Sequence, residues 1–359
     1  MLLKSMSNKP IKILLIRFSS FGDIVQSLSI LSVLKNRWPE AEIHWVTRSE
    51  FKPLIEDHPA LDKVWILNRK LGIRGLFQIA EQLNKSSFTK IYDAHNNLRS
   101  LFICTYLIIA HVIKGHKPPE VLRRSIRRIK RFLLFNFRYN LFELPFSGQR
   151  DLLEPLVQWG ISATPPSVPQ IFIHQELPSF VKSKLQNIPI FIALAPSAAF
   201  ALKRWPLNHW KKLIQLWLDL DQQIHFILLG GPDDLFLNEL VVINPNKIHN
   251  FAGKLSLSES ASLVKRSHLL IANDTGLLHV GEQLGHPTVA LMGPAPFGFP
   301  CRRETTEILE LDLKCRPCSK HGQGPCRNAH FQLCLDGISP ELVLQKSIDK
   351  IQSNIRPNL

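Results

Sequence analysis

Residues 14–31, LLIRFSSFGDIVQSLSIL, change from the pattern of a β-strand to that of an α-helix within a few positions. The apolar run breaks at Ser19–Gly22, and helical spacing resumes after Asp23. A strand followed at once by a helix is the first half of a βα unit, in which ligands bind at the carboxyl end of the strand. Asp is also favoured at a helix N-cap, so Asp23 is predicted either to cap this helix or to act on a ligand.

The βα pattern recurs along the chain in two series that flank the proline-rich stretch 161–170. The first helix has Ile24, Leu28, Leu31 and Leu34 on one face, which predicts a buried face. Strand patterns occupy 11–18, 42–47, 63–67 and 90–94, and then 188–196, 224–231, 268–274 and 288–294. We therefore predict an α/β fold with two doubly wound, Rossmann-like parallel-sheet domains, residues 1–170 and 171–338, and a closing helix over 339–359.

Length and charge restrict the class of protein. The 359 residues can form two domains with buried cores, and the hydrophobic content of 45% excludes a largely disordered chain. Lys and Arg number 44 against 29 Asp and Glu, a net charge of +15. This surplus favours an anionic partner, which could be nucleic acid, an acidic membrane surface or a phosphorylated small molecule.

The sequence carries no secretory or membrane-spanning signal that we identify. Met1–Pro10 is polar, and the longest apolar stretch, residues 101–113, is shorter than the roughly 20 residues that cross a bilayer. We expect a cytoplasmic chain, either soluble or peripheral to the membrane.

Two cations follow a strand in the second series. Lys203 and Arg204 stand before a helix and after a loop that is rich in small residues, Ser197, Ala198, Ala199 and Ala201. Small side chains allow a ligand to approach the backbone, and paired cations at a strand end suit a diphosphate. The alternative is a solvated Lys-Arg pair in an exposed loop.

Carboxylates and a helix start follow two further strands. Asp274, Thr275 and Gly276 open a helix that also carries His279, and the free amides there predict an anion site. A helix cap by Asp274 and a core His279 are the alternatives. Asp233, after Gly230–Gly231, could accept hydrogen bonds from ribose hydroxyls, although carboxylates also occur at helix starts for dipole reasons alone.

The stretch 114–138 holds nine Lys or Arg and one acidic residue, Glu120. Its apolar residues Leu122, Ile126, Ile129 and Leu133 fit one face of a helix, so the stretch predicts a basic amphipathic helix. Such a helix suits an anionic lipid or a phosphorylated glycan, with nucleic acid as another possible partner and a solvated face as the alternative.

Four of the six cysteines, Cys315, Cys318, Cys326 and Cys334, lie within twenty residues. The spacing of the first pair matches that of zinc ligands, but no second Cys-x-x-Cys follows, so reduced structural cysteines are favoured over a zinc site.

Taken in chain order, these motifs resemble glycosyltransferase family 9, the heptosyltransferases of lipopolysaccharide inner-core synthesis. The matching segments are IRFSSFGDIVQSLSIL (16–31), DAHNNLRS (93–100), PSAAFALKRWP (196–206), NDTGLLHV (273–280) and CRPC with CLDGISPELV (315–318 and 334–343). The resemblance implies a GT-B architecture, in which the two domains face each other across a cleft and the closing helix packs back toward the first. It also implies inverting transfer of L-glycero-D-manno-heptose from ADP-heptose to Kdo-lipid A or a heptosyl acceptor.

The resemblance further implies roles for residues. Asp23 corresponds to the general base and Lys203 to the lysine that binds the leaving diphosphate. Donor binding is expected from Ser197, Arg204, Asp233, Asp274, Thr275, Gly276 and His279. Acceptor binding is expected from Ser20, Gly22, Arg69, Lys70, Arg74, Asn97, Arg99, Arg123, Arg124 and Arg127. No metal or other cofactor is expected, and the enzyme should be a monomer at the inner face of the inner membrane that does not bind nucleic acid.

Two departures leave the donor sugar open. Ser197 stands where relatives often have glycine, and GPAPFGFPCRRE (293–304) matches the family loosely. The alternatives are a transferase of the same fold that uses another nucleotide sugar, and a basic nucleic-acid-binding protein.

Overall fold

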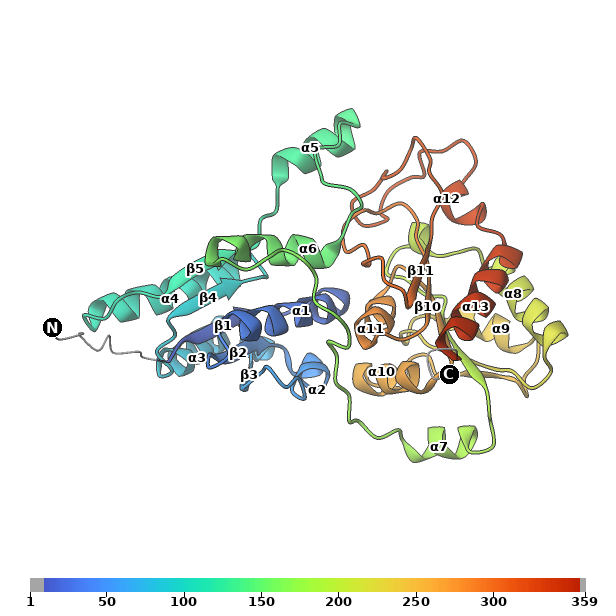
Figure 1. Cartoon of the computed structure of the whole chain (residues 1–359), viewed down its shortest axis with the longest axis horizontal. Coiled ribbons are helices and arrows are strands. Elements are labelled where there is room, and N and C mark those ends of the chain that lie inside the picture. The colour runs from blue at the N-terminus through green and yellow to red at the C-terminus, as the bar shows by residue number, and fades with distance from the viewer. Residues whose placement is uncertain (1–9, 356–359) are drawn as a thin grey trace. The chain divides into compact units, whose positions relative to one another are not determined.

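The computed structural model describes residues 10–355, and the sequence prediction for Met1–Pro10 therefore lies, apart from Pro10, outside the described residues. Two parallel β-sheets are present, each flanked by helices (Figure 1). This confirms the predicted α/β class with two Rossmann-like sheets. Within residues 10–355, no helix is both long enough and apolar enough to cross a membrane.

The first sheet has the strand order β3-β2-β1-β4-β5. Its strands are β1 (Lys12–Ile16), β2 (Glu42–Thr47), β3 (Lys63–Ile66), β4 (Lys90–Asp93) and β5 (Glu120–Arg123). The central strand β1 pairs in parallel with β2 and β4, with Leu15 opposite Trp45 on one side and Tyr92 on the other. All four strands predicted in this half are confirmed, and β5 is an additional edge strand.

Helices cover both faces of this sheet. The buried side chains of α3 (Gly72–Asn84) and α4 (Leu98–Ile113) form one cluster with Leu14 and Ile16 of β1. Helix α1 (Phe21–Arg37) covers the other face (Figure 1). Its predicted face of Ile24, Leu28, Leu31 and Leu34 is fully buried. The shorter elements are η1 (Ser49–Phe51), α2 (Lys52–Ile55), η2 (Arg69–Leu71), α6 (Gly148–Leu153) and η3 (Glu154–Trp159).

Helix α1 starts earlier than the sequence predicts. Its first residue is Phe21, so Asp23 lies inside the first turn and the residue before the helix is Ser20. The prediction that Asp23 occupies the N-cap is therefore wrong. A carboxylate in the first turn still interacts favourably with the helix dipole.

The predicted basic helix over 114–138 is also wrong in its first half. Residues 120–123 form β5, in which Val121 pairs with Ile91 of β4, and the helix α5 is confined to Arg128–Phe137. Pro118 and Pro119 lack the amide hydrogens that a helix needs, and pairing with an open sheet edge satisfies the backbone of the following residues. The predicted apolar face does not form either, because Ile129 is 76% exposed.

The second sheet has the order β11-β10-β9-β6-β7-β8. Its strands are β6 (Phe191–Ala195), β7 (His225–Leu228), β8 (Ile248–Asn250), β9 (Leu269–Asn273), β10 (Thr288–Leu291) and β11 (Thr306–Leu309). Its other elements are α7 (Ser179–Leu185), η4 (Ala201–Lys203), α8 (Leu207–Leu220), η5 (Leu235–Leu237), α9 (Asn238–Val241), α10 (Leu257–Arg266), α11 (Gly276–Leu284), α12 (Leu333–Asp336) and α13 (Pro340–Ile355). The four predicted strands are confirmed, whereas β8 and β11 are new.

The closing helix α13 begins at Pro340, as the Ser339-Pro340 pair predicts. It packs on α8 and on β9, β10 and β11, and Lys350 donates to the carbonyl oxygen of Glu304 over 2.7 Å. The helix thus covers the sheet of its own half of the chain, and its packing toward the first domain stays a prediction.

The two sheets belong to two compact units whose limits do not follow chain order. One unit comprises the residues up to Ser20, 27–126 and 150–166; the other comprises Phe21–Gln26, Arg127–Gln149 and the residues from Ser167 onward. The first turn of α1 is therefore part of the unit that contains the second sheet. The boundaries at 170 and 338 stay predictions.

Buried histidines make the stability of this fold sensitive to pH. Burial lowers the pKa of His286 to about 4, from an ordinary value near 6.5. The unfolded chain binds a proton at this residue on acidification before the folded chain does, so folding stability should fall as the pH drops from 6.5 to about 4. Urea unfolding between pH 7 and 4.5 should show this loss, and H286Q should reduce its slope; an unchanged slope in H286Q would contradict the assignment.

Candidate functional site

Two predicted site residues form a direct ion pair at the ends of neighbouring strands. Lys203 follows β6 and Asp274 follows β9, and Lys203 Nζ lies 2.6 Å from Asp274 Oδ2. The side chains are only 13% and 7% exposed. Their charges therefore interact in a largely desolvated setting, where ion pairing is stronger than in water.

The loops that carry this pair are tied together by Asn273, which sequence reasoning missed. Its side chain is fully buried, donates through Nδ2 to the carbonyl oxygen of Pro196 over 2.6 Å, and accepts from the amide of Trp205 over 3.1 Å. Trp205 in turn donates through Nε1 to the carbonyl oxygen of Ile338. Asn273 thus fixes the loop before Lys203 relative to the residue before Asp274.

The first turns of α1 and α11 are in close contact. A Cβ atom on Gly276 would lie 2.1 Å from Cδ1 of Phe21, and one on Gly22 would lie 2.9 Å from Cδ2 of His279. Neither position can accept a side chain without movement of its neighbour. The contact brings the turn that carries Asp23 against the predicted anion site of α11.

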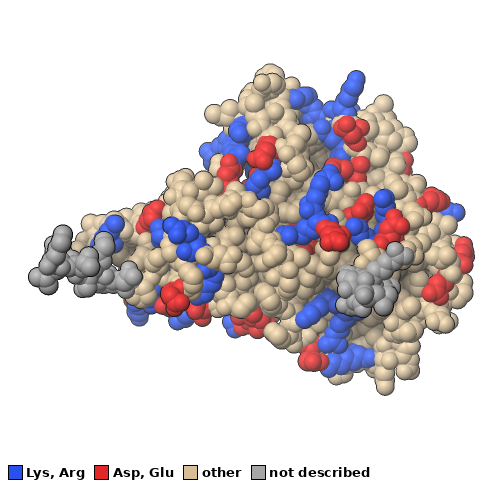
Figure 2. Space-filling model, viewed as in Figure 1, with Lys and Arg blue, Asp and Glu red and all other residues tan. Residues whose placement is uncertain are grey.

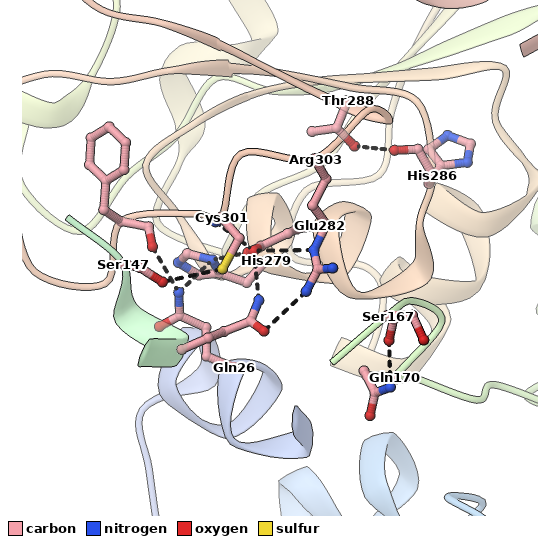
Figure 3. Close-up of polar contacts among 12 residues, drawn as sticks. Gln26, Ser147, Ser167, Gln170, His279, Glu282, His286, Thr288, Cys301 and Arg303 are labelled. Carbon is pink, nitrogen blue, oxygen red and sulfur yellow. Dashed lines mark hydrogen bonds and ion pairs between the residues drawn. The ribbon is translucent and has the colours of Figure 1, made fainter. Parts of the chain in front are cut away.

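A network of buried polar side chains extends this contact (Figure 3). Gln26 Nε2 lies 3.2 Å from His279 Nδ1 and donates to the carbonyl oxygen of Gly298. His279 Nδ1 is also 3.3 Å from Glu282 Oε2. The remaining members are Gln149, Cys301, Arg303 and, through a contact with Cys301, Ser147.

A second group of cations lies near Lys203. The Cα of Gly322 packs so closely on Lys203 that an added Cβ would be 2.7 Å from its Cγ. Burial lowers the pKa of the adjacent His321; the cations Lys320, Lys203 and Arg131 lower it further, whereas Asp23 opposes them. These basic side chains could receive an anion.

Other predicted donor residues have different surroundings. Arg204 donates through Nε to the carbonyl oxygen of Ala198 and lies 3.7 Å from Asp234, not from the predicted Asp233. Asp234 also accepts from the amide of Gly231, whereas Asp233 is exposed. Thr275 occupies the N-cap position of α11 but makes no side-chain cap hydrogen bond, and Ser197 follows β6.

The predicted acceptor residues fall in both compact units. Gly22 and Arg127 belong to the unit with the second sheet, and the other eight belong to the first. Two of them have a fixed structural role: Arg123 Nε donates to the buried Asp93 over 2.9 Å, and the side chain of Asn97 forms a capping box with Ser100 at the start of α4. Of the eight predicted acceptor residues in the first unit, Ser20, Arg69, Lys70, Arg74 and Arg99 are exposed.

The cysteine cluster contains no disulfide, and its four thiols are free. Within residues 10–355 no group of three or more His, Cys, Asp or Glu side chains has the arrangement of a metal site. Cys315 and Cys326 instead accept hydrogen bonds from Asn328 and from the amide of Gln332. Burial raises the pKa of Cys334 to about 11, which keeps its thiol protonated at neutral pH.

Helical spacing could have revealed some of the residues that sequence reasoning missed. Glu282 lies three positions after His279 and Gln26 three after Asp23, so each shares a helix face with a predicted site residue. His321, Lys320 and Arg131 carry no such signal, because their approach to Lys203 depends on the path of irregular chain segments.

The comparison with protein families settles the classification. The model of glycosyltransferase family 9 (heptosyltransferase) matches residues 76–325, which is more than half of the chain. The chain belongs to glycosyltransferase family 9. It is therefore a glycosyltransferase, as the sequence motifs predict.

Curated relatives match over nearly the whole length. Lipooligosaccharide heptosyltransferase 2 of Haemophilus ducreyi is 27% identical, over 93% of this chain and 98% of the relative. The protein of the same name from Haemophilus influenzae is 28% identical, over 93% and 97%.

The fold is similar to that of a solved heptosyltransferase. The structure of Escherichia coli ADP-heptose lps heptosyltransferase II superposes with a TM-score of 0.69 at 21% identity and covers 96% of this chain and 99% of its own. This likeness confirms the GT-B class predicted from sequence.

The contact between Phe21 and Gly276 can be tested by stability alone. G276A should lower the free energy of unfolding by about 1–3 kcal/mol, because the new methyl group overlaps the Phe21 ring. In the F21A background the added cost of G276A should shrink, since the ring is gone. The matched control is G231A, whose Cβ would meet its nearest atom at 3.5 Å. Equal effects of G276A and G231A would contradict this packing.

Proposed function

We propose that this family 9 enzyme transfers L-glycero-D-manno-heptose from ADP-heptose to the inner core of lipopolysaccharide, with inversion at the anomeric carbon. The observation that carries the proposal is the contact of the first turn of α1 with the first turn of α11, in one compact unit with the Lys203–Asp274 pair. The names of the relatives, which are heptosyltransferases acting on lipooligosaccharide or lipopolysaccharide, support the donor and acceptor classes.

In the proposed reaction Asp23 acts as the general base. Its carboxylate removes the proton from the acceptor hydroxyl while that oxygen forms a bond to the anomeric carbon of the donor. The bond from that carbon to the diphosphate oxygen breaks, and ADP leaves with the bonding electrons. The dipole of α1 favours the ionised form of a carboxylate in its first turn, which suits this role.

Stabilisation of the leaving diphosphate is assigned to Lys203 and to the start of α11. Lys203 is a largely buried cation, and the first amides of the nine-residue helix α11 have no partners within the helix. A lysine together with helix-terminal amides can offset the charge that develops on the diphosphate. Asp274 holds Lys203 in place through their ion pair. Arg204 and Asp233 are proposed to contact the rest of the nucleotide, and Ser197 and Thr275 its phosphates.

Kinetics of two variants test these roles. D23N should lower kcat by about 100-fold or more, because it removes the base, and should leave ADP affinity within about twofold. K203M should weaken both ADP binding and turnover, and it should also destabilise the fold by leaving Asp274 unpaired.

The double variant K203M/D274N separates the two effects of Lys203. It should regain the stability that K203M loses without regaining activity. Normal transfer by D23N would refute the base assignment, and normal ADP affinity in K203M/D274N would refute the diphosphate role.

The second candidate function is transfer from another nucleotide sugar. A panel of ADP-, UDP- and GDP-sugars with truncated lipopolysaccharide acceptors, read by mass, distinguishes the two, since a heptose-sized gain from ADP-heptose alone supports the proposal. Nucleic-acid binding is disfavoured, because on the face shown in Figure 2 the basic side chains stand among acidic ones.

We further propose that the monomeric enzyme works at the cytoplasmic face of the inner membrane and contacts the bilayer through α5. On this basic helix Ile129, Phe132 and Phe137 are 76%, 57% and 66% exposed. Exposed apolar side chains beside Arg and Lys suit an anionic bilayer surface.

Vesicle sedimentation tests this contact. I129D/F132D should lose most of its binding to vesicles that contain anionic phospholipid. The matched control is V242D, since Val242 is 77% exposed in another part of the same unit. Equal binding by the two variants, or no binding by the wild type, would refute membrane contact by α5.

A further inference from the structure

Glu282 is a fully buried carboxylate on α11, three residues after His279 and on the same face of the helix. We propose that Glu282 is a positioning residue of the transfer reaction: its carboxylate holds a proton on Nδ1 of His279 and so fixes the ring edge that His279 presents to the first turn of α1. The inference rests on the proposed function, because its consequence for catalysis runs through Asp23.

One oxygen of Glu282 is held rigidly. Oε1 accepts from Nε2 of Gln149 over 2.6 Å and from the amide of Cys301 over 2.7 Å, and Nε of Arg303 lies 4.0 Å away. Arg303 also donates to Oε1 of Gln149. These contacts offset the cost of burying the carboxylate (Figure 3). Because they hold Oε1 in place, they also fix the position of the second oxygen, Oε2.

That second oxygen faces His279. Oε2 of Glu282 lies 3.3 Å from Nδ1, and Nε2 of Gln26 lies 3.2 Å from the same atom. The two hydrogens of the Gln26 amide have acceptors in the carbonyl oxygens of Gly298 and Phe299, at 3.2 and 3.5 Å. The Gln26 amide can donate only to an unprotonated Nδ1, so it competes with the Glu282 carboxylate for this atom. Because both amide hydrogens also have carbonyl acceptors, the charged carboxylate decides this competition and favours the proton on Nδ1.

The opposite edge of the His279 ring meets α1. A Cβ on Gly22 would lie 2.9 Å from Cδ2 and 3.5 Å from Nε2 of this ring, and Asp23 is the next residue. With the proton on Nδ1, a neutral His279 presents the lone pair of Nε2 at this contact; the other tautomer would present an N–H group. The same arrangement, in which a buried carboxylate sets the tautomer of a histidine, governs catalysis in other enzymes.

The variant E282Q isolates this interaction. The amide oxygen of Gln can keep the hydrogen bonds from Gln149 and Cys301, and the group that faces His279 changes from an acceptor to a donor. The substitution also removes the negative charge 4.0 Å from Nε of Arg303, so its effect on stability is measured beside the effect on kcat. The matched control is T288V, which removes another buried hydrogen bond of the same unit, from Thr288 Oγ1 to the carbonyl oxygen of His286, outside the network (Figure 3).

We expect three results for E282Q. Its kcat should fall about tenfold or more relative to T288V. Its ADP affinity should stay within about twofold of the wild type, and its unfolding midpoint should stay close to that of T288V. The ¹⁵N spectrum of histidine-labelled protein, with the His279 signals assigned from H279Q, should show the proton on Nδ1 in the wild type and on Nε2 in E282Q.

The tautomer readout separates this inference from the proposed function. An Nε2-protonated His279 in the wild type, or the same tautomer in both proteins, would overturn the role of Glu282. A change of tautomer with unchanged kcat would overturn its link to catalysis. A wild-type chain that transfers no heptose would refute the proposed function, whereas the spectra would still decide whether Glu282 sets the tautomer.

Discussion

The organisation of the candidate site depends on a steric constraint, the absence of side chains at Gly22 and Gly276. These two glycines let the first turns of α1 and α11 approach until the Phe21 ring lies on one and the His279 ring on the other. The approach places Asp23 in the compact unit that contains Lys203 and Asp274. A methyl group at either position would separate the turns, and every polar contact between them would lengthen.

Buried charges around this contact have partners of opposite sign or strong hydrogen-bond donors. Asp274 pairs with Lys203, and Glu282 accepts from Gln149 and the amide of Cys301 near Arg303. In the first unit the buried Asp93 pairs with Arg123 and accepts from Ser100. Such pairs contribute little net stability compared with apolar packing, but removal of one partner is costly, so they favour one arrangement of the loops.

The sequence predicts the parts of the fold that depend on local patterns. Continuous apolar strands and the 3.6-residue period of α1 and α8 are expressed within short segments, so their positions could be predicted from residues alone. The strand β5 is harder to predict, because its residues also fit a helical period. Pro118 and Pro119 disfavour a helix just before it, but the pairing partner, the free edge of β4, lies outside the local sequence. Likewise the first residue of α1, Phe21, packs against Gly276, more than two hundred positions away, and this contact has no local signal in the sequence.

The residues of the candidate site also fall into those that the sequence reveals and those that only the structure reveals. Asp23, Lys203 and Asp274 stand at strand ends, where the topology of a parallel sheet brings ligand-binding residues together, so their motifs can be recognised in the sequence. Asn273 and His321 take their importance from contacts between distant segments, whereas Glu282 shares a helix face with His279 and could have been found by its spacing. A residue at the end of a strand can be recognised from the few residues around it, whereas a buried hydrogen-bond network joins residues that are far apart in the sequence and is seen only in the folded chain.

The compact units also bear on the construction of chimeras within the family. Because Phe21–Gln26 and Arg127–Gln149 belong with the second sheet, an exchange of residues 1–170 for those of a relative would replace part of the interior of that unit. The exchange would replace Gln26 and Gln149 but keep His279, Glu282 and Arg303. The buried carboxylate of Glu282 would then lose the hydrogen bond that Gln149 donates. A hybrid that preserves this interior must take residues 21–26 and 127–149 from the same parent as α11, so the exchangeable module of this enzyme is discontinuous in sequence.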